Sequence, residues 1–305
     1  MTDFDPAAPF EELRELRQAV GRRDWPAVAA RFAALTDPND HEYAAGIVAG
    51  VAGSEDFLAA CAEREPGTLA RTLYAGRLIS AGWEVRSSAR AKNVSREQFA
   101  TFHDHLRRAE RILVGVTAEE PANATAWTSR IRVNRGLQLG QNEARRRYDR
   151  LSRHVPHVYA AQAGIVQQFC PKWSGSFEKA RAFGLECLRA APDGSLAPLA
   201  LLEVYVEICF EEGNGKVWKL PETRAEVYEA ADRSVRHPAF RADGYRALTA
   251  HNLFALVFWV MGDRAAARPH FEFVGEHGGG DLWNYFSPTD GRSLYLSARK
   301  AVVKS

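Results

Sequence analysis

Segments long enough to form helices, divided by Pro, Gly, Asn or Asp, follow one another through this 305-residue sequence. Alternating strand-like segments are scarce, so the chain is predicted to be all-α. The 49 alanines also favour helix. Ser95 with Gln98 predicts a capping box, and Ser176 predicts an N-cap. Helices are expected over residues 9–20, 25–36, 41–52, 55–64, 67–84, 95–117, 123–139, 141–154, 157–169, 176–191, 196–212, 222–236, 241–261 and 264–276.

The clearest candidate repeat unit covers residues 251–274. Two small residues, Ala255 and Ala267, precede Phe258 and Phe271, and a Gly-Asp turn at 262–263 divides the two halves. This unit resembles a tetratricopeptide repeat, in which small residues let two helices approach closely. The resemblance implies an irregular tetratricopeptide-like α-solenoid of stacked helical hairpins, because the turns are not spaced by multiples of the regular repeat.

A second, local resemblance covers roughly residues 150–210. The sequence Pro-Lys-Trp-Ser-Gly-Ser at 171–176 is similar to a turn of an uncharacterised bacterial family of helical-repeat proteins. Ser174 stands where that family has Gly. In physical terms, Pro171 predicts a helix stop at Cys170 and Gly175 a tight turn. This resemblance supports the fold and implies no activity.

Charge is distributed unevenly along the chain. Residues 1–70 carry 6 basic and 13 acidic side chains, whereas residues 71–157 carry 17 basic and 8 acidic ones. We expect residues 1–280 to form the helical array, with an acidic part at 1–70 and a basic part at 71–157. Aromatic residues after a Gly-Gly-Gly break predict a capping segment at 281–305, because a terminal hairpin otherwise exposes its stacking face. A self-association surface is the alternative there.

Polar residues recur every four positions on the expected helix at 123–139, namely at Arg130, Asn134 and Gln138. The tetratricopeptide resemblance implies that the first helix of a hairpin lines a concave groove, where Arg or Asn holds an extended peptide. It places Asn252 in the groove as well. On the next expected helix, arginines at i, i+4 and i+7 share one edge. These are Arg146, Arg150 and Arg153.

These features predict a non-catalytic interaction or scaffold module that binds an acidic peptide or protein. A solvated helix face is the plain alternative. A second hypothesis is an enzyme acting on a small anionic molecule, with His251, Asn252, Trp259 or the arginines in a cleft. A third is a nucleic-acid-binding regulator, although the charge excess is regional and the overall pI is about 8.3.

Familiar catalytic and cofactor motifs are missing from the sequence. It contains no G-x-G-x-x-G, G-x-S-x-G or H-E-x-x-H. His103 and His105 lie two apart on an expected helix and point away from each other, so no metal site is predicted. The four cysteines form no C-x-x-C pair and are expected to be buried thiols. No cofactor is predicted, and the absence of a signal peptide or a membrane-length apolar run predicts a cytoplasmic protein.

Overall fold

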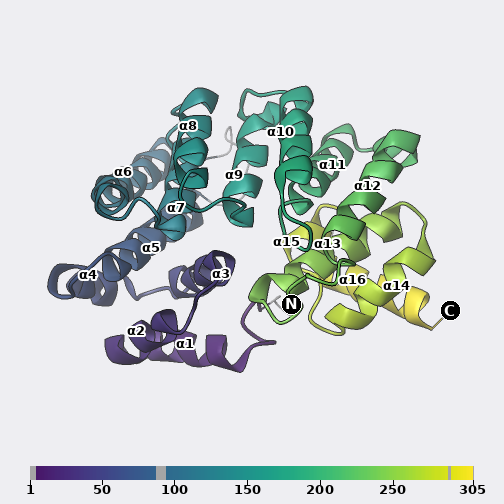
Figure 1. The fold of residues 1–305 in the computed structure, drawn as a ribbon. Helices are drawn as coiled ribbons and strands as arrows, with labels where there is room; N and C mark the ends of the chain where they lie inside the picture. The colour runs from purple at the N-terminus through teal and green to yellow at the C-terminus, as the bar shows by residue number, and fades with distance from the viewer. Residues whose placement is uncertain (1–4, 87–93, 288–289, 305) are drawn as a thin grey trace. The chain divides into compact units, whose positions relative to one another are not determined.

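A computed structural model describes residues 5–86, 94–287 and 290–304 of the chain. These described residues form sixteen α-helices and no strand, so the all-α prediction is confirmed (Figure 1). Every expected helix is found, with its ends within four residues of the expected bounds. Two further helices lie in the C-terminal segment, where the sequence predicted a packed element of unspecified structure. The fold is compatible with a helical-repeat array.

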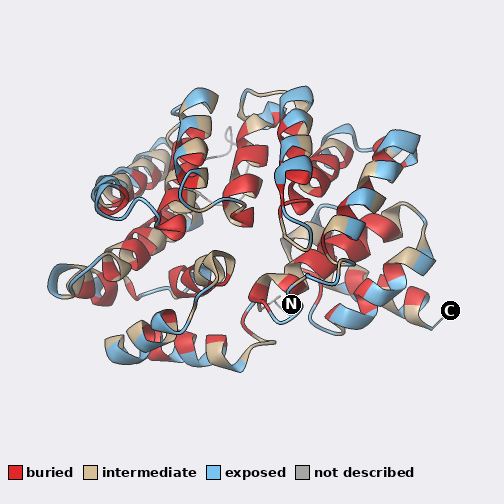
Figure 2. Cartoon of the chain, in the orientation of Figure 1, coloured by how far each residue is buried: buried red, intermediate tan, exposed pale blue. Residues whose placement is uncertain are grey.

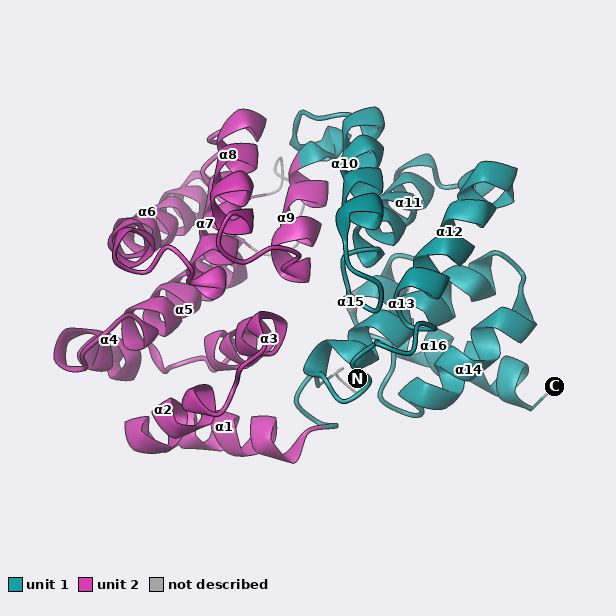
Figure 3. Cartoon of the chain, viewed as in Figure 1, with its two compact units in different colours: residues 1–9, 169–305 teal, residues 10–168 magenta. Residues whose placement is uncertain are grey.

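The chain divides into two compact units, which are coloured separately in Figure 3. Unit 2 covers residues 10–168 and unit 1 covers residues 1–9 and 169–305. The helices of unit 2 are α1 (Glu11–Gly21), α2 (Trp25–Ala33), α3 (Pro38–Ala49), α4 (Glu55–Arg64), α5 (Leu69–Arg86), α6 (Arg96–Glu119), α7 (Ala124–Gly136), α8 (Gln141–Ser152) and α9 (Tyr159–Phe169), of which the last residue belongs to unit 1.

Unit 1 contains the remaining helices, including two short 3-10 helices. They are η2 (Pro171–Trp173), α10 (Phe177–Ala190), α11 (Leu199–Glu212), η3 (Lys216–Lys219), α12 (Pro221–Arg233), α13 (Tyr245–Val260), α14 (Arg264–Val274), α15 (Asp281–Asn284) and α16 (Gly291–Val303).

The core of unit 2 lies between α5, α6 and α7. Helix α6 contributes residues spaced alternately by four and three positions, so that they form one stripe along the helix. These residues are Phe102, Leu106, Ala109, Leu113 and Val116, and none is more than 2% exposed. Figure 2 shows this division into a buried and an exposed side. The capping box that the sequence predicted at Ser95 and Gln98 is present at the start of α6.

The helices α3, α5 and α7 of unit 2 contact one another in all three pairings. On the other side of this group, α6 packs against α5 and α7, and α8 packs against α7. Helix α7 is therefore enclosed by partners on several sides. Polar residues of α7 are therefore available to a ligand only where these neighbouring helices do not engage them.

The core of unit 1 is built around α13. Its residues from Ala250 to Phe258 are all buried, as expected of a helix that is covered on every side. The predicted hairpin is present: Gly262 has a positive φ of 76°, and Asp263 caps α14 by accepting a hydrogen bond from the Ala266 amide. Ala255 and Ala267 are 0% exposed. The two small residues are therefore buried, and the helices that carry them pack against each other.

The turn at residues 170–176 forms as the sequence predicted, with one additional detail. Helix α9 ends at Phe169, and the Ser176 side chain accepts a hydrogen bond from the Lys179 amide to cap α10. A Cβ on Gly175 would lie 2.0 Å from the Phe169 carbonyl oxygen, so only glycine fits there. Ser174 adopts a left-handed conformation with φ 67°, which explains why the similar turn can carry Gly at this position.

The C-terminal segment packs onto α14. Phe271, Trp283 and Tyr295 are each 0% exposed, with ring centroids 5.2 to 5.9 Å apart. The Tyr295 hydroxyl donates a hydrogen bond to the Gly275 carbonyl at 2.7 Å. The predicted capping role of residues 281–305 is consistent with this packing and stays a prediction.

Candidate functional site

Two of the three residues in the polar stripe that the sequence assigned to a ligand, Arg130 and Asn134, are engaged by residues of neighbouring helices. The Arg130 guanidinium donates to the Glu110 carboxylate at 2.9 Å and to the Thr117 hydroxyl at 2.9 Å. From α8, Arg147 donates to the same carboxylate at 2.8 Å. Glu110 of α6 thus joins α7 and α8 through two arginines.

The next residue of the stripe, Asn134, is 0% exposed. Its amide nitrogen donates to the Gly140 carbonyl at 2.9 Å and to the Gln168 side chain at 3.1 Å. Gln138 lies beyond the end of α7, where it is exposed and has a positive φ of 55°. The structure therefore does not bring these three side chains together on one open surface.

Asn252 in unit 1 is also engaged within the fold. Its amide nitrogen donates to the Gly279 carbonyl at 3.0 Å. Its amide oxygen accepts from the Gly279 amide at 3.3 Å and from the Trp283 indole at 2.9 Å. These bonds give Asn252 a structural role in holding the segment that follows α14.

The three arginines that the sequence placed on one edge lie on α8 and at its C-cap, Arg153. Arg146, Arg150 and Arg153 are all exposed, while Arg147 between them is buried. Arg146 forms an ion pair with Glu143 of the same helix. With the described residues, Arg150 and Arg153 form no ion pair.

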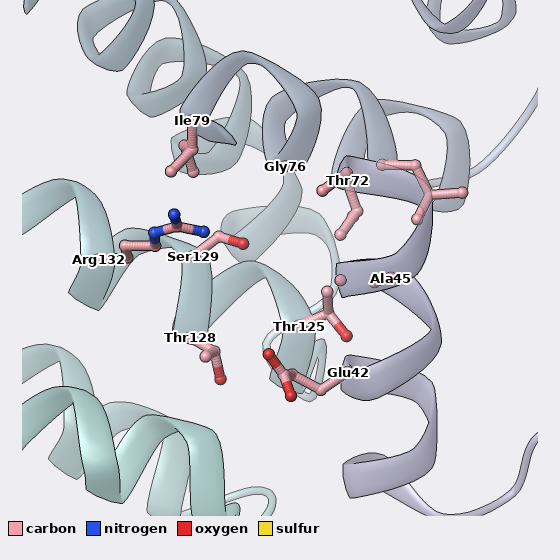
Figure 4. Close-up of a pocket in the computed structure, with 12 residues that line it drawn as sticks. Glu42, Ala45, Thr72, Gly76, Ile79, Thr125, Thr128, Ser129 and Arg132 are labelled. Atoms are coloured by element: carbon pink, nitrogen blue, oxygen red, sulfur yellow. The ribbon is translucent and has the colours of Figure 1, made fainter. Parts of the chain in front are cut away.

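A different face of α7 lines a pocket that the sequence reasoning missed. Thr125, Thr128, Ser129 and Arg132 lie at positions i, i+3, i+4 and i+7, which is one face of a helix. Arg132 is about 200° around the helix from both Arg130 and Asn134. Figure 4 shows these four side chains along one side of the pocket. We call it the α3–α5–α7 pocket; all of its residues belong to unit 2.

The other two helices contribute mainly small residues. Helix α3 lines the pocket with Glu42, Ala45, Gly46 and Ala49, at the same i, i+3, i+4, i+7 spacing. Helix α5 supplies the remainder of the lining: Thr72, Leu73, Gly76 and Ile79. The pocket has a volume of about 70 Å³. That is room for a few water molecules or one compact polar group, and not for a whole drug-sized ligand.

Arg132 is the arginine that lines the pocket, and it has no acceptor among the residues that the structure describes. It is exposed, and with the described residues it forms no hydrogen bond or ion pair. Its guanidinium carbon lies 5.9 Å from the centre of the Trp83 ring. Arg77, in contrast, donates to Glu84 at 2.7 Å and to Glu55 at 2.8 Å.

The electrostatic setting of Arg132 is mixed. Although solvent reaches its side chain, desolvation by the surrounding protein lowers the pKa of Arg132, while the charges of Glu42 and Glu84 act to raise it. The guanidinium stays charged at neutral pH because its reference pKa is so high. An arginine with five unused donors in a partly desolvated pocket can hold a carboxylate by two parallel hydrogen bonds.

Hydroxyl groups in the same pocket as Arg132 could form further hydrogen bonds with a ligand. The Thr128 hydroxyl is buried and has no hydrogen-bond partner among the described residues. The structure also gives the Ser129 hydroxyl no partner among these residues. Thr125, at the other end of the same face, is already engaged with the His41 ring at 3.0 Å. The hydrogen-bonding groups of this helix face that have no protein partner are therefore those of Thr128, Ser129 and Arg132.

The residues that the structure describes were searched for metal-binding clusters, and their cysteines were compared with the expectation from the sequence. They contain no group of three or more His, Cys, Asp or Glu side chains placed to hold a metal ion. All four cysteines are buried thiols that form no disulfide, as expected: Cys61, Cys170, Cys187 and Cys209.

Comparison of the chain with protein-family models, curated proteins and solved structures gave no match. Among the described helices, none combines the length and the apolar character needed to cross a bilayer. Function must therefore be argued from the geometry of the chain itself.

Proposed function

We propose that this protein is a non-catalytic interaction module that binds an acidic peptide segment of a partner at the α3–α5–α7 pocket. The observation that carries the proposal is Arg132, a charged side chain that lines the pocket and has no acceptor among the residues that the structure describes. The proposal keeps the acidic partner that the sequence predicted. It moves the contact from the Arg130–Asn134 face of α7 to the Thr125–Arg132 face.

The chemistry of the pocket supports a carboxylate ligand. The Arg132 guanidinium provides the charge, and the hydroxyls of Thr128 and Ser129 provide further hydrogen bonds. The small pocket volume suits a single acidic side chain of a longer segment whose remainder lies outside. An exposed peptide bound mainly by charge should bind less tightly as salt increases.

The test is a selection of peptides on the full-length protein, followed by affinity measurements. A random peptide library panned on the immobilised chain should be enriched in Asp and Glu. The Kd of the selected peptides, measured by fluorescence anisotropy, should rise roughly 10-fold or more in Arg132→Ala, because a charged hydrogen bond contributes about 1.5–3 kcal/mol.

Arg150→Ala is the matched control, since Arg150 is an exposed, unpaired arginine of the same unit outside the pocket. It should change the Kd less than twofold. A selected pool without acidic enrichment, or equal losses in the two variants, would remove the proposed site.

A nucleic-acid-binding role is the second candidate, and the exposed arginine edge of α8 is what favours it. If it is correct, single-stranded or duplex probes bind at low salt, and the triple variant Arg146→Ala, Arg150→Ala, Arg153→Ala loses that binding. The slope of affinity against salt should also fall, because phosphate contacts are lost. No binding at low salt would eliminate this candidate.

A further inference from the structure

Two glycines lie inside the helices that line the α3–α5–α7 pocket, Gly46 on α3 and Gly76 on α5. Glycine inside a helix is unfavourable relative to alanine, because its backbone loses more conformational freedom on folding. Neither glycine has a positive φ, so the backbone conformation would accept alanine at both positions. A different physical reason must therefore account for each glycine.

Glycines inside other helices of the chain are explained by close packing. A Cβ on Gly82, Gly164 or Gly184 would lie between 2.9 and 3.1 Å from an atom of another helix. Such distances are shorter than ordinary van der Waals contacts, so a side chain there would force the neighbouring helix to move. Glycine at these three positions allows two helices to approach each other.

The two glycines of the pocket have no such neighbour. Among the residues that the structure describes, no atom outside its own part of α3 lies within 4 Å of the place that a Cβ on Gly46 would take. Gly46 is exposed, although Ala45 and Ile47 on either side of it are buried. A Cβ on Gly76 would lie 3.7 Å from the Cβ of Ala49, which is an ordinary contact. Packing between the described helices therefore does not require glycine at either position.

The open space beside Gly46 belongs to the pocket. Gly46 shares one face of α3 with Ala45 and Ala49, and all three line the pocket. A side chain at position 46 would therefore extend from this face into the pocket. The pocket volume of about 70 Å³ holds only a few water molecules, and a methyl group is about as large as one of them. Even alanine at position 46 would remove a large part of this room.

We infer that Gly46 is a specificity-determining residue of the proposed site, because the acidic side chain of the bound peptide occupies the space that a side chain at position 46 would fill. The carboxylate of the peptide meets Arg132 and the hydroxyls of Thr128 and Ser129. The methylene groups of the same side chain lie against the small residues of α3. Glycine thus lowers the stability of α3 and keeps the pocket open.

This inference rests on the proposed function, because it assumes that an acidic side chain enters the pocket. It adds a requirement for space to the requirement for charge. Gly46 carries no charge, so its replacement leaves every charge of the site in place. An effect of position 46 on binding therefore reports access to the pocket and not electrostatic attraction.

The experiment measures stability and binding on the same full-length variants. The probe is the most enriched acidic peptide from the library selection, labelled with fluorescein. Gly46→Ala should raise the Tm by about 1–3 °C, because alanine favours the helix and meets no described atom at close range. The same substitution should raise the Kd of the probe about 10-fold, since the added methyl occupies room that the peptide needs.

A larger side chain should strengthen the effect on binding. Gly46→Leu should raise the Kd more than about 30-fold, because it fills more of the pocket. A library selection repeated on Gly46→Leu should give a pool without enrichment in Asp and Glu, although Arg132 is still present.

Gly115 provides the matched control. It is an exposed glycine inside α6 and outside the pocket, and a Cβ there would also have no described atom within 4 Å beyond its own part of the helix. Gly115→Ala should raise the Tm by a similar amount, and neither Gly115→Ala nor Gly115→Leu should change the Kd more than about twofold. Stability and affinity should thus change in opposite directions only at position 46.

The outcomes separate this inference from the function on which it rests. If Gly46→Ala lowers the Tm, the fold itself requires the glycine and the inference is overturned. If both Gly46 variants leave the Kd within twofold of the wild type while Arg132→Ala raises it, the inference is overturned and the proposed function stands. If no selected peptide depends on Arg132, both are overturned.

Discussion

Helix α13 of unit 1 and helix α7 of unit 2 both carry polar residues that the sequence assigned to a ligand, and the two helices use these residues differently. On α13, His251 contacts His270, with the two Nδ1 atoms 3.1 Å apart, and Asn252 holds Gly279 and Trp283. On α7 one polar face is engaged by neighbouring helices, while a second face carries an arginine without an acceptor. A polar residue on a packed helix is thus available to a ligand only if other parts of the fold do not already use its hydrogen-bonding groups.

The largest expected effect concerns the histidine pair of α13. Burial lowers the pKa of His251 to about 4, and burial with the nearby His251 and Arg236 lowers that of His270 to about 3. Because the unfolded chain keeps pKa values near 6.5, it binds more protons than the native state below that pH. Stability is therefore present above pH 6.5 and is lost as the pH falls toward 4.

Between pH 7 and pH 5.5 the free energy of unfolding should fall by about 2.5 kcal/mol for the two histidines together. Urea unfolding at a series of pH values measures this. The double variant His251→Asn, His270→Asn should flatten the dependence, whereas His154→Asn, at an exposed position, should not. An unchanged slope in the double variant would show that the pair is not the cause.

The second prediction tests the engaged face of α7. Glu110→Ala removes the acceptor shared by Arg130 and Arg147, whose side chains are only 11% and 5% exposed. We expect a loss of about 2–3 kcal/mol in the free energy of unfolding, because two nearly buried guanidinium groups lose a shared charged acceptor, with only Thr117 left to Arg130 and Glu143 left to Arg147 among side chains. The exposed Asp104→Ala on the same helix should change stability by less than about 0.5 kcal/mol. Equal effects in the two variants would contradict a structural role for Glu110.

The third prediction tests the engaged residues of α13. Asn252→Ala leaves the Gly279 backbone groups and the Trp283 indole without their bonding partner, and should lower the free energy of unfolding by about 2 kcal/mol. Loss of near-ultraviolet circular dichroism from the buried tryptophan would accompany it. Asn142→Ala, at an exposed position of α8, is the control. If the Asn252→Ala protein is as stable as the wild type but has lost peptide binding, Asn252 contacts the ligand and has no structural role.

The smallest effect is expected on the open face of α7. Arg132→Ala should change the free energy of unfolding by less than about 0.5 kcal/mol, because the side chain has no acceptor to lose. Arg130→Ala, two residues away, should be clearly destabilising. If the two variants are equally destabilised in urea, Arg132 has a structural partner and the distinction between the faces of α7 fails.

Local signals in the sequence predicted the helices well. Proline, glycine and capping residues act through neighbouring backbone groups, so Ser95, Ser176 and the 262–263 turn were found directly. Helix α16 was missed because the aromatic residues around it suggested packing without a helical period. The short helix α15 has only four residues, which is too few to show a helical period in the sequence.

The candidate site could not be found in the same way. The apolar residues of α7, including Ala126, Ile131 and Val133, point in several directions because the helix has neighbours on several sides. Hydrophobic periodicity therefore does not identify its open face. The sequence shows the spacing of Thr125, Thr128, Ser129 and Arg132, but the four-residue spacing of Arg130, Asn134 and Gln138 favours the other side of the helix equally well. Which face stays open depends on where α6 and α8 pack.

The burial of all four thiols has a practical consequence for labelling chemistry. Desolvation raises the pKa of Cys61, which keeps its thiol in the unreactive protonated form. A maleimide dye added to the native protein should therefore find little to react with. One cysteine introduced at the exposed position of Arg150 would then be the main attachment point, and a fluorophore there could report on unit 2 without removing any natural residue from its interior.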